Sequence, residues 1–299
     1  MLPWSAVLAS RLDELEIDSV LLRDNPLGDP ARRPLWVYVP PGYDSSQQRY
    51  PSVYVIQGYT GHLAMWRNRN PFRQPFPETA DAVFAAGDVP PAVLVFVDAW
   101  TAYGGSQFVD SPGTGRYHSY LCEEIVPFID ARYRTLPGRA HRAISGKSSG
   151  GFGAMITPML RPDLFGALAS HAGDSLYELC YLAEFGKSVR HLRDYDGDIS
   201  AWWADFRSRT PFTKPADTNL LMMLGISACF SAPRGRHPRA AVRPAQRGAA
   251  SGGLAALAGL GPGADGAAVR RGTAIDAGGV ARRRDPGRVV PRSRRAGIP

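Results

Sequence analysis

A serine stands between two glycines at the point where an apolar run gives way to a run of small residues. The segment Gly146-Lys147-Ser148-Ser149-Gly150 follows residues 141–145, which read as a short strand, and precedes residues 151–160, which read as a buried helix. Glycines two positions before and after a serine let a strand and a helix pack closely around a strained turn. The pattern therefore predicts that Ser148 is exposed at the carboxyl edge of a sheet.

The chain around this turn alternates between apolar runs and segments with helical spacing. Strands are expected at 33–39, 52–57, 92–97, 141–145 and 165–171, and helices at 78–86, 117–131 and 151–160. Strands that alternate with helices form parallel sheets with right-handed crossovers. We therefore expect an α/β fold with a mostly parallel sheet and helices on both faces.

The predicted turn supplies the parts of a nucleophilic site. The Ser148 hydroxyl would attack, and the backbone N–H of Ser149, at the start of a helix, would face the developing oxyanion. A second N–H donor is expected in the loop that follows the strand 52–57, where Gly58-Tyr59-Thr60-Gly61 stands. Tyr59 N–H is the candidate and Gly58 the next choice. The alternative is that these residues form an ordinary glycine turn.

Several separate motifs resemble one family of esterases. They are Pro40–Tyr43, Ser106–Pro112 with Gly115–Tyr117, Glu123–Ile129 with Tyr133–Thr135, and the elbow extended to Met155. Over residues 30 to 230 the chain is similar to the α/β-hydrolase family that includes esterase D, feruloyl esterases, enterochelin esterases and the antigen 85 mycolyltransferases. The resemblance implies a Ser-Asp/Glu-His triad that hydrolyses small-molecule esters through an acyl-enzyme, with no cofactor and no metal.

The chain departs from this pattern after the elbow. The histidines that follow Ser148 are His171, His191 and His237, and none stands after the expected late strand. His171 either lines the site or caps a strand, and Asp174 either positions substrate or forms a turn. We therefore expect that the last strands of the sheet, the triad acid and the catalytic histidine are missing, which would leave an impaired esterase.

The composition changes abruptly at Ala232, so we divide the chain into an incomplete esterase domain, 1–232, and a tail, 233–299. The tail has no aromatic residue, and Ala, Gly, Pro and Arg make up 49 of its 67 positions. Such a segment cannot offset the entropy of ordering itself and is expected to be disordered or loosely helical. We favour translation of a GC-rich gene out of frame. The alternative is a non-catalytic remnant whose basic tail, with 14 Arg, binds polyanions.

Other features exclude several classes of protein. The chain has no apolar run of about 18 residues, so no membrane span is expected. Its three cysteines, Cys122, Cys180 and Cys229, lack metal-ligand spacing and read as reduced, mostly buried thiols. The acidic N-terminal segment does not read as a secretion signal, which favours a cytoplasmic protein. The glycines at 261–266 follow no strand, so nucleotide binding is not expected, and we expect no specific nucleic-acid partner.

Overall fold

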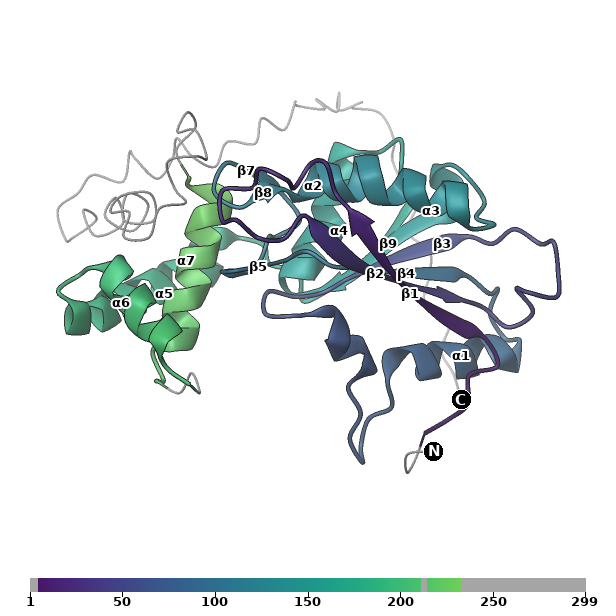
Figure 1. The fold of residues 1–299 in the computed structure, drawn as a ribbon, viewed down its shortest axis with the longest axis horizontal. Helices are drawn as coiled ribbons and strands as arrows, with labels where there is room; N and C mark the ends of the chain where they lie inside the picture. Colours follow the sequence, from purple (N-terminus) through teal and green to yellow (C-terminus); the bar gives the residue numbers. More distant parts are fainter. Residues whose placement is uncertain (1–4, 211–213, 233–299) are drawn as a thin grey trace, which may run out of the picture. The chain divides into compact units, whose positions relative to one another are not determined.

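The computed structural model describes residues 5–210 and 214–232 and contains a six-stranded sheet of order β1-β2-β4-β3-β9-β10 (Figure 1). Strands β4, β3, β9 and β10 are parallel, whereas β1 and β2 run antiparallel to their neighbours. The bounds are β1 Arg11–Asp18, β2 Arg32–Val39, β3 Ser52–Ile56, β4 Val93–Val97, β9 Arg142–Lys147 and β10 Ala167–His171. This confirms the expected α/β fold with a mostly parallel sheet.

Helices cover both faces of the sheet. α2 (Tyr117–Ser119), the π-helical turn η2 (Tyr120–Ile125), α3 (Val126–Arg132) and α4 (Ser149–Leu160) lie on one face, and η1 (Leu63–Arg67) and α1 (Phe76–Ala86) lie on the other (Figure 1). The strands alternate accordingly: in β4, Val93, Val95 and Val97 join the first core, while Leu94 and Phe96 join the second. This period of two explains why β4 reads as a continuous apolar run, because a strand buried on both faces needs apolar residues throughout.

The first strand has no counterpart in the sequence prediction. β1 consists of RLDELEID, and its side chains alternate between exposed and partly buried positions. Leu15 and Ile17 pack on the core, whereas Glu14 and Glu16 form ion pairs with Arg67 and Arg32. The strand was missed because its charges resemble those of an amphipathic surface helix, and only pairing with β2 decides between the two.

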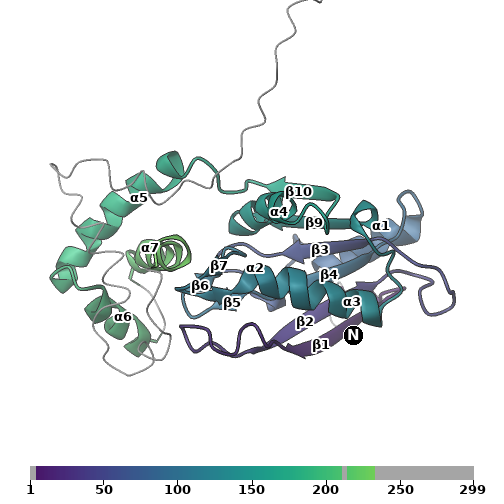
Figure 2. The same ribbon diagram turned by 90° about the horizontal axis from the view of Figure 1, so that it is seen from above.

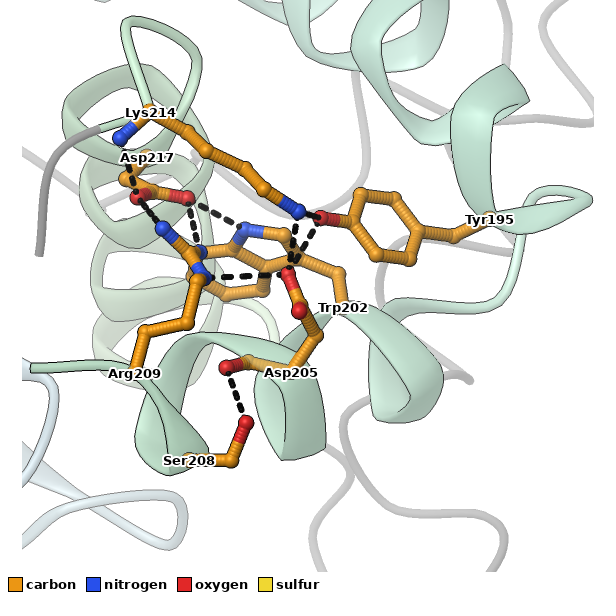
Figure 3. A network of polar contacts seen from close by, with 7 residues as sticks. All are labelled: Tyr195, Trp202, Asp205, Ser208, Arg209, Lys214 and Asp217. Carbon is orange, nitrogen blue, oxygen red and sulfur yellow. Dashed lines mark hydrogen bonds and ion pairs between the residues drawn. The ribbon is translucent and has the colours of Figure 1, made fainter.

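Three helices follow β10 and pack together: α5 (Tyr177–Leu192), α6 (Ile199–Ser208) and α7 (Asp217–Phe230), with the short turn η4 (Arg193–Tyr195) between the first two (Figure 2). Trp202 on α6 is fully buried between these helices. Trp202 Nε1 donates a hydrogen bond of 3.0 Å to Asp217, which also accepts two from Arg209 at 2.7 and 2.8 Å (Figure 3).

The remaining elements are short. The ribbons β5 (Trp100–Thr101) with β6 (Gly104–Gly105), and β7 (Asp110–Ser111) with β8 (Gly115–Arg116), follow β4, and η3 (Arg139–His141) precedes β9. Cys122 and Cys229 are buried free thiols, as expected, but Cys180 on α5 is exposed. In the ranges that the structure describes, no helix is both long enough and apolar enough to cross a membrane.

The sheet ends at β10 as far as residues 5–210 and 214–232 show, since no strand there pairs with its outer edge. The side chains of β10 are largely exposed, and 46% of Leu168 is accessible to solvent. Within this part of the chain, the outer edge of β10 therefore has no strand partner, and the loss of the last strands stays a prediction. The tail 233–299 lies outside the described residues. The division of the chain into a domain, 1–232, and a tail therefore stays a prediction.

Candidate active site

Ser148 occupies a strained turn between β9, which ends at Lys147, and α4, which begins at Ser149. Its backbone has φ 56° and ψ −124°, a region that residues with a side chain rarely adopt. Two hydrogen bonds of 2.9 Å hold this geometry: Ser148 N–H donates to the His171 carbonyl, and Phe152 N–H donates to the Ser148 carbonyl. The side chain is half-buried. The structure therefore contains the strand–turn–helix that the glycine spacing predicts.

The glycines around the turn allow backbone segments to meet that a side chain would keep apart. A Cβ on Gly146 would lie 2.3 Å from the Gly150 carbonyl oxygen, and one on Gly150 would lie 2.5 Å from the Gln57 carbonyl oxygen. A Cβ on Gly151 would lie 2.8 Å from Gly173 Cα. Real Cβ atoms do not approach this closely, so these positions require glycine.

The loop after β3 passes directly beside the elbow. A Cβ on Gly58 would lie 3.1 Å from the Lys147 carbonyl oxygen and 3.5 Å from Ser148 Cβ. The loop closes in a turn, because Gly61 N–H donates to the Gly58 carbonyl at 2.9 Å. The expected donor residue Tyr59 is therefore adjacent in sequence to the residue that contacts the elbow.

Ser149 stands on the other side of the serine. It is buried and is the first residue of α4, a helix of twelve residues. The first N–H groups of a helix have no partner within the helix, and the helix dipole favours negative charge at this end. The structure thus brings a half-buried hydroxyl, a helix N-terminus and a glycine loop together, which is an arrangement that can stabilise an oxyanion.

The sequence left the roles of His171 and Asp174 open between contact with substrate and a structural role. His171 is the last residue of β10, and its side chain is exposed while its carbonyl holds the Ser148 N–H. Asp174 accepts a hydrogen bond of 2.6 Å from the Tyr181 hydroxyl of α5. Burial, with this bond to Asp174 as a second cause, raises the pKa of Tyr181. Both residues therefore have a structural contact, and a contact with substrate stays a prediction.

No base is found for Ser148 in the part of the chain that the structure describes. There, no histidine or carboxylate forms a hydrogen bond with the Ser148 hydroxyl, and no group of three His, Cys, Asp or Glu could hold a metal ion. His62 instead accepts a bond from Ala64 N–H, and His118 lies 3.8 Å from the Cys122 thiol. His237, Asp276 and Asp285 lie outside the described residues.

Comparison with known proteins gives a family match over most of the folded region. Residues 30–218 match the model of the family described as "Putative esterase". A curated relative, an endo-1,4-beta-xylanase/feruloyl esterase of Xylanibacter ruminicola, is 27% identical over 139 residues, which are 44% of this chain and 18% of that protein. The uncharacterized protein YbbA of Bacillus subtilis is 26% identical over 153 residues, 48% of this chain and 57% of its own length. The chain thus spans less than two thirds of either relative.

The chain is also similar to solved structures. A ferulic acid esterase is 23% identical with a TM-score of 0.46, and the match covers 56% of this chain and 61% of that one. An S-formylglutathione hydrolase from Agrobacterium tumefaciens is 19% identical with a TM-score of 0.43, covering 56% of this chain and 60% of that one.

Proposed function

Because the chain belongs to the Putative esterase family, we propose that it is a serine-dependent carboxylic-ester hydrolase in which Ser148 is the nucleophile. One observation carries the proposal: Ser148 sits in a strained, half-buried turn with the Gly58 loop on one side and the N-terminus of α4 on the other. Its substrate is a small-molecule ester, and the chemistry needs no cofactor.

The proposed reaction has two halves. The Ser148 oxygen bonds to the ester carbonyl carbon, its proton passes to a base, and the carbonyl oxygen becomes an oxyanion that accepts hydrogen bonds from the Tyr59 and Ser149 N–H groups. The carbon–oxygen bond to the alcohol then breaks, and the alcohol leaves with a proton. Water attacks the resulting acyl-serine in the same way, which releases the acid and restores the hydroxyl.

We further propose that this chain performs the reaction slowly. The described residues offer Ser148 no hydrogen-bonded histidine, so its hydroxyl is not activated there. Loss of a triad member costs on the order of 10⁴-fold or more in rate, while the oxyanion donors and binding retain part of the acceleration. A small turnover that depends on Ser148 is therefore expected.

Hydrolysis of p-nitrophenyl acetate by the full chain and by Ser148→Ala tests both parts of the proposal. We expect a low rate in the full chain and a lower one in the variant. Equal rates in the two proteins would refute the role of Ser148. A turnover close to that of a complete triad enzyme would refute the impairment and would show that the chain supplies its own base.

A second candidate function comes from the arginine content of the tail, 14 residues against three acidic ones. In this alternative the chain is a non-catalytic remnant that binds polyanions without sequence preference. A fluorophosphonate probe separates the candidates, because labelling at Ser148 supports a reactive site and silence supports the remnant. Heparin binding that disappears on removal of residues 233–299 would support the second candidate.

We propose a cytoplasmic location, which the state of the cysteines supports. All three thiols are free, which suits a reducing compartment. Fractionation of cells that express the protein tests this location.

A further inference from the structure

The side chain of Tyr59 lies in a slot lined by glycines. A Cβ on Gly104 would lie 2.6 Å from Tyr59 Cε2, and one on Gly225 would lie 2.9 Å from the same atom. A Cβ on Gly105 would lie 2.9 Å from the Tyr59 carbonyl oxygen. Gly104 and Gly105 form β6, whereas Gly225 belongs to α7. The ring is thus held between two elements that could not carry side chains at these positions.

The hydroxyl of Tyr59 contacts the backbone just before β6 and the backbone of α7. It lies 2.5 Å from the Tyr103 carbonyl oxygen and 2.6 Å from the Leu221 carbonyl oxygen of α7, so its single proton is shared between two acceptors. Burial raises the pKa of Tyr59, which keeps the hydroxyl protonated and able to donate at any ordinary pH. Tyr59 and Leu221 are 162 positions apart in the sequence, so this contact joins distant parts of the chain.

Helix α7 also has packing contacts that do not depend on Tyr59. The Ser111 hydroxyl donates to the Ala228 carbonyl at 2.6 Å, and Phe230 packs edge-on against Phe152 of α4 with ring centroids 5.7 Å apart. These contacts fix α7 against β7 and against the helix that follows Ser148. The helix can therefore serve as a fixed support for the Tyr59 side chain.

We propose that Tyr59 is a positioning residue: its side chain anchors the loop Gly58–Gly61 to α7, and α7 thereby sets the direction of the Tyr59 N–H relative to Ser148. The catalytic consequence rests on the proposed function, since it assumes that this N–H faces an oxyanion. The anchoring of the loop does not rest on the proposed function, because contacts within the structure join α7 to Tyr59 and Gly58 to the elbow. Displacement of α7 would then misplace the oxyanion donor.

Hydrogen exchange of the full chain tests the anchoring. Tyr59→Phe removes only the hydroxyl, and we expect amide exchange in 58–61 to become about tenfold faster, as loss of one buried hydrogen bond allows. Exchange in 220–226 should keep its rate, because α7 has contacts that do not depend on Tyr59. The matched control is Tyr133→Phe, which removes a hydroxyl that donates to Asp13 at 2.9 Å far from the elbow. This control should leave both segments unchanged. Unchanged exchange in 58–61 overturns the proposal.

A second variant keeps the test decisive if Tyr59→Phe unfolds. Gly225→Ala raises the intrinsic helix propensity of α7 but fills the space beside the Tyr59 ring. Loosening of 58–61 in this variant supports the anchor, and an unchanged loop contradicts it.

Labelling with a fluorophosphonate separates the two proposals. If the unaltered chain does not label at Ser148, the proposed function fails and the exchange data still decide the anchor. If it does label, Tyr59→Phe should react about tenfold more slowly and Tyr133→Phe at the unaltered rate.

Discussion

Gly58 and Ser148 lie so close together that a Cβ on Gly58 would be 3.5 Å from Ser148 Cβ. This approach joins the loop after β3 to the elbow after β9, two strands that are neighbours in the sheet. Because both strands end at the same edge, the loop and the elbow depend on the same close packing of glycines.

Gly150→Ala should destabilise the protein. The added Cβ would lie 2.5 Å from the Gln57 carbonyl oxygen, so the backbone must shift, at a cost of about 1–3 kcal/mol. Gly186→Ala is the control, since nothing lies within 4 Å of a Cβ in that position of α5, and it should stabilise by about 0.5–1 kcal/mol. Urea denaturation gives both values. Equal effects of the two changes would contradict the close packing.

Ser148→Gly should be more stable than Ser148→Ala. Alanine keeps the strain of φ 56°, whereas glycine relieves it, and the expected difference in unfolding free energy is about 1 kcal/mol. At Ser200, in the ordinary helix α6, the same pair of changes should show the opposite order. A more stable alanine variant at both positions would show that the elbow is not strained.

Asp217→Asn should lower the melting temperature clearly. Asp217 accepts hydrogen bonds from Arg209 and from the buried Trp202, and the amide cannot replace the charge that faces Arg209 (Figure 3). The control is Lys214→Met, which removes a half-exposed partner of Asp205 and should change the melting temperature little. Calorimetry on both variants compares them. A larger loss of melting temperature with Lys214→Met than with Asp217→Asn would contradict the contribution expected of Asp217.

The contribution of Asp217 should depend on pH in the acid range. Burial opposes its ionisation, but the bonds from Arg209 and Trp202 outweigh burial and lower its pKa below the ordinary 3.8. A lowered folded-state pKa means that the stabilisation is complete above the unfolded value of 3.8 and is lost as pH falls through the folded pKa. The difference in melting temperature between the unaltered chain and Asp217→Asn should therefore shrink below that pH. A constant difference would contradict this.

Leu168→Lys should reduce self-association. Leu168 is 46% exposed on β10, whose outer edge has no partner among the described strands, and such edges promote pairing between molecules. A lysine there places like charges opposite each other in any such pair. Val20→Lys, at a residue 64% exposed away from the edge, is the control and should have no effect. Light scattering over a concentration series measures both.

Local sequence patterns were sufficient for much of the fold. The period of two and the apolar runs predicted β2, β3, β4 and β9, because a strand with two covered faces must be apolar. The run at 165–171 also predicted β10, although the side chains of that strand are largely exposed. The glycine spacing at 146–150 predicted the turn at Ser148, because the backbone contacts there exclude any Cβ. Strand β1 was missed because its charges fit a surface helix equally well. Only its pairing with β2 decides that the segment is a strand.

The sequence by itself determined the elements whose cause is local: the buried strands and the glycine elbow. Only the tertiary structure decided which distant groups meet. No pattern near Tyr59 indicates that its hydroxyl lies beside Leu221, and none indicates that the His171 carbonyl holds the Ser148 N–H. The physical reason is that side-chain periodicity records which face a residue buries, whereas a contact across 162 positions is set by the packing of whole elements.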